Sequence, residues 1–177
     1  MGQGVIKSER RGKVRLSKGV GDSTMEPEAL GRLFDRHAPA LVLYARQWTA
    51  TPEDVVQDAF VKLSQSRTEA DQIVPWLFRV VRNAAINAGR ADRNRRRREA
   101  SRVVEEAWFA SVDDQLDAQA ATRWLAELEE DAREVIICRI WGGLTFEEIA
   151  QLQGCSVSTA HRRYQAGLSL LNARIER

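Results

Sequence analysis

The sequence predicts an all-α protein of two small helical domains joined by a flexible linker, the second ending in a helix-turn-helix. Apolar residues recur at helical spacing along most of the 177 residues, whereas strand-like alternation is scarce. The four prolines are scattered, and 44% of the residues are hydrophobic, so the helices can bury a core. A Gly-centred turn between two capped helical segments near the C-terminus is typical of a helix-turn-helix.

Charge is segregated along the chain, although the net charge is only +2. Residues 79–102 contain nine Arg against two acidic residues, and residues 103–134 contain ten acidic residues against two Arg. A basic block beside an acidic block indicates a nucleic-acid surface near a region that avoids nucleic acid or binds a basic partner.

Several functional classes are not expected. Cys138 and Cys155 are the only cysteines and belong to no close Cys or His pair, so we predict no metal site. No nucleophile–base pair or Gly-rich phosphate loop is visible, so we expect neither an enzyme nor a cofactor. No run approaches the ~18 apolar residues of a membrane helix, and no signal peptide is visible. We therefore expect a soluble, cytoplasmic protein without membrane insertion.

The first domain is predicted to occupy residues 25–95. Residues 1–24 precede it and are basic with little apolar periodicity, which favours a disordered tail. A helical pattern then runs from Pro27 to Trp48. Pro39 should bend or break this helix, because proline lacks the backbone N–H and its ring crowds the preceding turn.

A second helix is predicted to start at Thr51, which can cap it, with Pro52 at the first helical position. Asp54, Gln57 and Asp58 fall on its polar face. Helix-start electrostatics can explain the acidic residues here, and for Glu53 in the first turn we accept this explanation. For Gln57 and Asp58, which lie deeper in the helix, a surface for a partner is the alternative.

A third helix is predicted to open at Pro75, with one apolar and one basic face. The basic face carries Arg79, Arg82, Asn83, Asn87, Arg90 and Arg93. A merely solvated helix would usually alternate acids with Arg, but this one contains no acid before Asp92. Because Arg can contact phosphates and Asn can read a base edge, the pattern predicts contact with nucleic acid.

A linker is predicted over residues 96–115. The four arginines of 95–98 repel one another, so they should be extended or form a frayed helix end. Trp108 and Phe109 are the linker's only large apolar residues, and they could dock on either domain or on a partner.

The second domain is predicted to occupy residues 116–177 and to end in the helix-turn-helix. Thr145 and Glu148 have capping-box spacing, Gly154 can end that helix, and Ser156 can cap the next. The polar face of the last helix carries Ser158, Thr159, His161, Arg162 and Arg163. Its leading end could enter the major groove of DNA. The alternative is a helical hairpin with a solvated basic face.

The successive motifs resemble those of bacterial extracytoplasmic-function (ECF) sigma factors over roughly residues 28–175. The matching segments are Asp54–Phe60, Pro75–Asn83, Arg133–Val135, Gly143–Ala150 and Ser156–Thr159. Each motif alone is weak, but their shared order is specific. In one departure, Ala166 and Gly167 stand where many members are basic, so phosphate contacts there are not expected.

The resemblance implies a protein that binds core RNA polymerase and promoter DNA, with an anti-sigma factor as a further partner. Asp54, Gln57 and Asp58 match the family's polymerase-binding positions. Residues for the minus-ten element are Arg79, Arg82, Asn83, Asn87 and Arg90. Residues for the minus-thirty-five element are Ser156, Ser158, Thr159, His161, Arg162 and Arg163. The alternative function is a helix-turn-helix regulator that acts without polymerase, but it would leave the basic third helix without a role.

Overall fold

A computed structural model describes residues 25–66, 71–99 and 124–175. These residues form helices joined by turns, with no strand among them, which confirms the all-α prediction. The helices are α1 (Pro27–Ala45), α2 (Pro52–Ser64), α3 (Ile73–Glu99), α5 (Glu130–Ile140), α6 (Phe146–Gln153) and α7 (Val157–Ile175). A short helical turn at residues 124–127 precedes α5.

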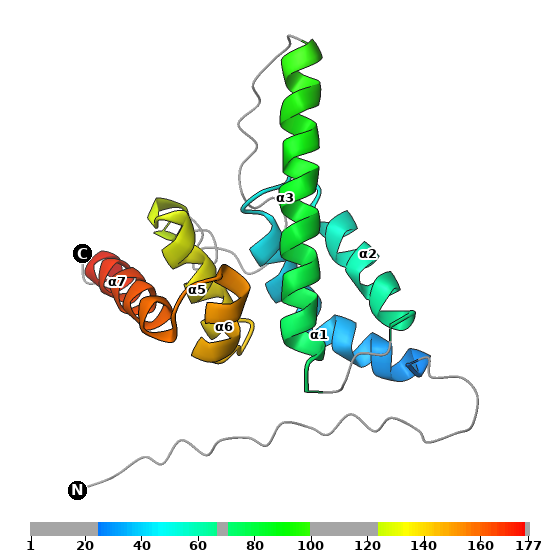
Figure 1. Cartoon of the computed structure of the whole chain (residues 1–177), viewed down its shortest axis with the longest axis horizontal. Helices are drawn as coiled ribbons and strands as arrows, with labels where there is room; N and C mark the ends of the chain where they lie inside the picture. Colours follow the sequence, from blue (N-terminus) through cyan, green and yellow to red (C-terminus); the bar gives the residue numbers. More distant parts are fainter. Residues whose placement is uncertain (1–24, 67–70, 100–123, 176–177) are drawn as a thin grey trace, which may run out of the picture.

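The helices pack as two groups that touch each other. Helices α1, α2 and α3 contact one another, and so do α5, α6 and α7. Between the groups, α1 contacts α5 and α3 contacts α6. In Figure 1, the C-terminal part of α3 extends beyond the other helices. Fully buried residues of both groups, such as Leu41, Phe78, Ile136 and Ile149, belong to one continuous hydrophobic cluster.

Proline at position 39 does not break the first helix, so the predicted break was wrong. Helix α1 continues through Pro39 to Ala45. The ring of Pro39 lies on the exposed side, while Ala38, Ala40 and Leu41 around it are buried. A proline in a helix interior costs about 3 kcal/mol, whereas burying one leucine side chain contributes about 1.5–3 kcal/mol. Packing of α1 against the core therefore outweighs the missing hydrogen bond.

Helix α3 is longer than the sequence predicts at both ends. It begins at Ile73, whose side chain is buried, rather than at Pro75. It ends at Glu99, so the arginines of 95–98 are helical and the predicted domain boundary at residue 95 falls inside the helix. The basic tail and residues 100–123, which include Trp108 and Phe109, lie outside the described residues.

Among the described residues, none of the helices combines the length and the apolar character that spanning a membrane requires. Nor do three or more His, Cys, Asp or Glu side chains gather in those ranges where they could hold a metal ion. Cys138 is fully buried, and Cys155 is half-buried in the turn after α6.

Candidate nucleic-acid interface

The turn between α6 and α7 is fixed by hydrogen bonds between residues close in sequence. The Glu148 N–H donates to Thr145 Oγ1 at 3.2 Å, and the Thr145 N–H donates to Glu148 Oε2 at 2.7 Å. Gly154 ends α6 with φ 65° and ψ 36°, a left-handed conformation that favours glycine. The Ser156 hydroxyl then accepts the Thr159 N–H at 3.1 Å and caps α7. The predicted caps and turn are confirmed.

The leading end of α7 presents polar groups to solvent. Ser156, Ser158, His161 and Arg162 are exposed, and Thr159 is half-buried. The Ser156 hydroxyl lies 2.9 Å from that of Ser158 and 2.8 Å from that of Thr159. These short donors and acceptors, with Arg162 one turn further along, have the size and chemistry to reach base edges and phosphates.

Arg163 behaves differently from its neighbour Arg162. Its guanidinium forms an ion pair with Asp131 at the start of α5 and donates to Gln153 Oε1 at 3.0 Å. Its side chain is 28% exposed. Arg163 therefore ties α7 to α5 and α6, while Arg162 points to solvent. The sequence grouped the two arginines, because helical spacing alone does not say which of two adjacent residues borders a neighbouring helix.

The inner face of α7 explains one departure from the ECF pattern. A Cβ atom at Gly167 would lie 3.0 Å from Ile136 Cγ1, so the missing side chain lets α7 approach α5 closely. Ala160 is fully buried on the same face. Val157, the first residue of α7, is 42% exposed.

The basic face of α3 is largely exposed. Arg79, Asn83, Asn87 and Arg90 all face solvent. Successive members are separated by four, four and three residues, so they lie along one stripe of the helix. The stripe offers two guanidinium groups for phosphates and two amides that can read base edges.

Arg82 leaves this stripe and faces the second group of helices. Its Nε donates to Glu134 Oε1 at 2.7 Å, and its guanidinium lies 5.7 Å from the centroid of the Trp48 ring. Burial disfavours the charged form of Arg82 and is the largest single influence, but the hydrogen bond to Glu134 and the nearby charges of Glu134, Tyr44 and Glu130 together outweigh it and raise the pKa of Arg82. In this arrangement Arg82 is held within the protein.

The polar face of α2 is exposed at Asp54, Gln57 and Asp58. Glu53 has a structural role, since it accepts a hydrogen bond from Arg46 at 2.9 Å, and this bond lowers its pKa. Thr51 occupies the N-cap position, but its side chain makes no capping hydrogen bond, so that part of the prediction was wrong. The Thr51 N–H instead donates to Thr49 Oγ1 at 3.2 Å.

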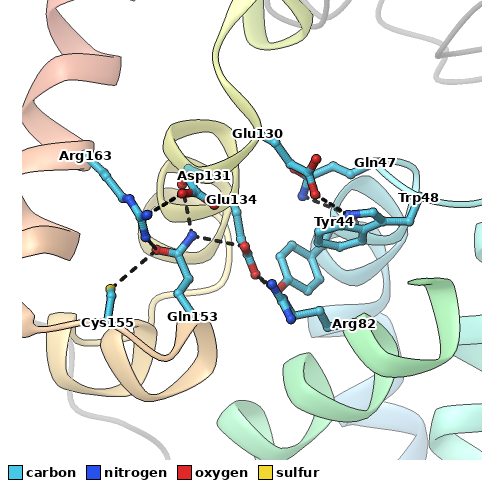
Figure 2. Close-up of polar contacts among 10 residues, drawn as sticks. All are labelled: Tyr44, Gln47, Trp48, Arg82, Glu130, Asp131, Glu134, Gln153, Cys155 and Arg163. Carbon is cyan, nitrogen blue, oxygen red and sulfur yellow. Dashed lines mark hydrogen bonds and ion pairs between the residues drawn. The ribbon is translucent and has the colours of Figure 1, made fainter. Parts of the chain in front are cut away.

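A buried polar cluster between the two groups of helices was not found from the sequence (Figure 2). Glu134 of α5 is 1% exposed and accepts hydrogen bonds from Tyr44 and Arg82. Burial and the nearby Glu134 charge raise the pKa of Tyr44 well above its usual value. Trp48 Nε1 donates to Glu130 Oε1 at 2.6 Å beside the cluster. The only signal in the sequence was an acidic residue next to an apolar run at 135–138.

Two family models match this chain. The model described as Sigma-70 region 2 matches residues 33–100, and the model described as Sigma-70, region 4 matches residues 118–171. The first match covers α1 to α3 almost entirely, and the second covers α5 to most of α7. The two surfaces described above therefore fall in two separately matched regions.

Curated relatives are also similar over most of their length. The RNA polymerase sigma factor CarQ of Myxococcus xanthus is 29% identical over 153 residues, which cover 81% of this chain and 87% of CarQ. The RNA polymerase sigma factor NccH of Alcaligenes xylosoxydans xylosoxydans is 27% identical over 163 residues, which cover 84% of this chain and 87% of NccH.

Among solved structures, CnrH in complex with the cytosolic domain of CnrY has a TM-score of 0.56 and 26% identity, covering 85% of this chain and 90% of CnrH. The fold is also shared with the sigma factor RpoE in complex with the anti-sigma factor NepR from Bartonella quintana. That match has a TM-score of 0.68 at 24% identity and covers 85% of this chain and 98% of the other.

Proposed function

Since the chain belongs to the sigma-70 family of RNA polymerase sigma factors, in its ECF group, we propose which of its surfaces perform each step of promoter recognition. A sigma factor binds core RNA polymerase and directs it to promoters, with region 2 serving the minus-ten element and region 4 the minus-thirty-five element. The observation that carries the proposal is that three polar faces, on α2, α3 and α7, are exposed on separate helices of these two regions.

The proposed minus-ten surface is the stripe of Arg79, Asn83, Asn87 and Arg90 on α3. Its exposure and its mixture of guanidinium and amide groups support contact with phosphates and bases. Opening a duplex costs ~1.4 kcal/mol per stacked step, and contacts to the separated strand offset part of that cost. Arg82 would join this surface only after it leaves Glu134.

The proposed minus-thirty-five surface is the leading end of α7. Arg162, Ser158 and His161 are exposed there and are proposed to contact DNA. Ser156 and Thr159 share a capping hydrogen bond, so we assign them a positioning role in addition to contact with DNA. Arg163 already forms an ion pair with Asp131 and donates a hydrogen bond to Gln153. It would reach DNA only if these two interactions were broken.

The proposed polymerase surface is the exposed face of α2 that carries Asp54, Gln57 and Asp58. Each DNA surface offers only a few phosphate contacts, and each neutralised phosphate changes the salt slope by about −0.9. Free affinity for DNA should therefore be modest. Polymerase holds both regions near the promoter, which raises their effective concentration and makes the pair selective.

Further partners and the place of action are also proposed. RpoE was solved with the anti-sigma factor NepR, and CnrH with the cytosolic domain of CnrY. By similarity, we propose that this chain too is held by an anti-sigma factor. It would act in the cytoplasm, where bacterial polymerase and promoters are found, as a specificity subunit with no catalysis of its own.

The proposed reading of the minus-thirty-five element is tested by Arg162→Ala. Loss of a groove contact of this kind costs about 1–3 kcal/mol, so transcription from a two-element promoter should fall about tenfold or more while polymerase binding persists. Run-off transcription and pull-down with core polymerase measure the two effects. Gln165→Ala, exposed on the same helix, is the control. Unchanged transcription with Arg162→Ala would contradict the assignment.

The polymerase surface is tested by changing Gln57 and Asp58 together to Ala. Binding to core polymerase should weaken, whereas circular dichroism should show an intact helical fold, because both side chains are exposed. Asp35→Ala removes an exposed acid from α1 and serves as the control. Failure of the wild-type chain to bind core polymerase would instead favour a regulator that acts alone.

A further inference from the structure

One buried carboxylate joins the two sigma regions. Glu134 Oε1 accepts hydrogen bonds from the Tyr44 hydroxyl and from Arg82 Nε, both in region 2. Glu134 Oε2 accepts from Gln153 Nε2 at 3.0 Å, within region 4. Figure 2 shows Glu134 between Gln153 on one side and Tyr44 and Arg82 on the other. Each oxygen of this carboxylate therefore serves a different region.

Aromatic packing surrounds the contact on the region 2 side. The Tyr44 ring lies 4.9 Å from Phe78 and 5.1 Å from Trp48, centroid to centroid. Phe78 in turn closely approaches Gly142, where an added Cβ would lie 2.6 Å from Phe78 Cζ. The two regions are thus fitted closely around the Glu134 contact, in which Glu134 is 1% exposed and the Arg82 side chain 28% exposed.

The energetics of this contact allow it to open. A buried charge is tolerated only when it is paired, and the cost of removing both ions from water nearly cancels their attraction. Separation of the regions would expose Oε1, the Tyr44 hydroxyl and Arg82 to water, while Gln153 stays beside Oε2. No polar group would be left buried without a partner, so the polar contact itself adds little to the closed arrangement. The apolar residues that the two groups share favour closure, and a partner that binds the open arrangement better offsets this.

We propose that Tyr44, Glu134 and Arg82 form an intramolecular latch, which closes region 4 onto region 2 and withholds Arg82 from promoter DNA. The latch rests on the geometry of this contact, whereas the role of Arg82 at DNA rests on the proposed function. If polymerase or DNA binds the open arrangement more tightly than the closed one, it shifts the population toward the open arrangement. The ratio of the two affinities sets the size of this shift.

The latch is tested by the distance between nitroxide labels on Lys62→Cys in α2 and Ala173→Cys in α7, in a Cys155→Ser background. Both labelled positions are exposed, and the remaining Cys138 is buried.

Two variants weaken the latch without changing its shape. Tyr44→Phe removes only the hydroxyl, and Glu134→Gln removes the charge while keeping the shape. Each should reduce the closed-to-open ratio by about tenfold, which broadens the distance distribution from double electron–electron resonance.

Matched controls are available in the same chain. Tyr164→Phe and Glu147→Gln make the same chemical changes in α7 and α6 at residues that do not bond to Glu134, and they should leave the distances unchanged. Circular dichroism checks that each variant keeps its helices. An unchanged distribution for both Tyr44→Phe and Glu134→Gln would overturn the latch.

A second measurement separates the latch from the proposed DNA role. The free Tyr44→Phe chain should bind a fluorescent promoter duplex several-fold more tightly than wild type, and adding Arg82→Ala should abolish the gain. Opening without this gain would support the latch and overturn the role of Arg82 at DNA. A gain in DNA affinity without any change in the label distances would overturn the latch.

Discussion

The helix-turn-helix of α6 and α7 and the contact around Glu134 are both held by polar side chains, but over very different distances along the chain. The hydrogen bonds at Thr145 and Ser156 join residues three positions apart. The hydrogen bonds to Glu134 from Tyr44 and Arg82 span 90 and 52 positions.

This difference in sequence separation determines which contacts persist when the two regions move relative to each other. Local caps persist whichever way the regions are arranged, because both partners travel together. The Glu134 contact exists only while region 2 and region 4 are packed against each other. The DNA-reading element thus remains a stable unit, while its placement relative to region 2 can change.

The largest effect is expected when the long-range contact is removed outright by Glu134→Ala. Loss of one partner of a buried ion pair is strongly destabilising, and Tyr44 and Gln153 would also lose their shared acceptor. We expect the free energy of unfolding to fall by about 3 kcal/mol while the two regions stay packed, and by less where they separate and water reaches Arg82 and Tyr44, measured by urea denaturation. Glu147→Ala, an exposed acid in the first turn of α6, is the control and should cost far less. Equal effects from the two variants would show that the contact contributes little.

A smaller effect is expected at the turn of the helix-turn-helix. Gly154→Ala places a side chain on a backbone with φ 65°, and the left-handed conformation costs about 1–2 kcal/mol for a residue with a Cβ. No atom lies within 4 Å of the new Cβ, so the cost would come from the backbone alone. Differential scanning calorimetry should show a lower Tm.

Gly31→Ala is the matched control for this change. Gly31 also has open space around its Cβ position, but it lies within α1. Because alanine favours a helix over glycine by up to about 1 kcal/mol, this variant should be stabilised. A shift of the same sign for both variants would mean that the left-handed turn is not what Gly154 provides.

The contrast between contacts close in sequence and contacts far apart in sequence also explains which features could be predicted from the sequence. The starts of α6 and α7 and the Gly154 turn depend on residues a few positions apart, so capping spacing was sufficient to predict them. The exposed faces of α2 and α3 followed from helical periodicity in the same way. The predicted break at Pro39 was wrong, because local helix propensity does not measure how much apolar surface α1 buries on either side of this residue.

The partners of Arg82 and Arg163 could not be predicted by these rules. Both arginines were grouped with exposed neighbours, yet Arg82 bonds to Glu134 and Arg163 pairs with Asp131. Their partners depend on which helix faces lie against each other, and single-sequence spacing does not encode that. The sequence predicted which polar side chains are exposed on α2, α3 and α7, but not the internal contacts of Arg82 and Arg163.

The smallest effect is expected at the capping box, and it tests whether a cap position matters without its hydrogen bond. Thr145→Ala removes the acceptor of the Glu148 N–H and should lower the free energy of unfolding by about 1 kcal/mol. Thr51→Ala changes the same residue type at the N-cap of α2, where the side chain makes no capping bond, so it should cost much less. Urea denaturation of the two variants side by side measures the difference. Equal losses would mean that the Thr145 bond adds nothing to helix-turn-helix stability, and the contrast between local and long-range contacts would then rest on Glu134 alone.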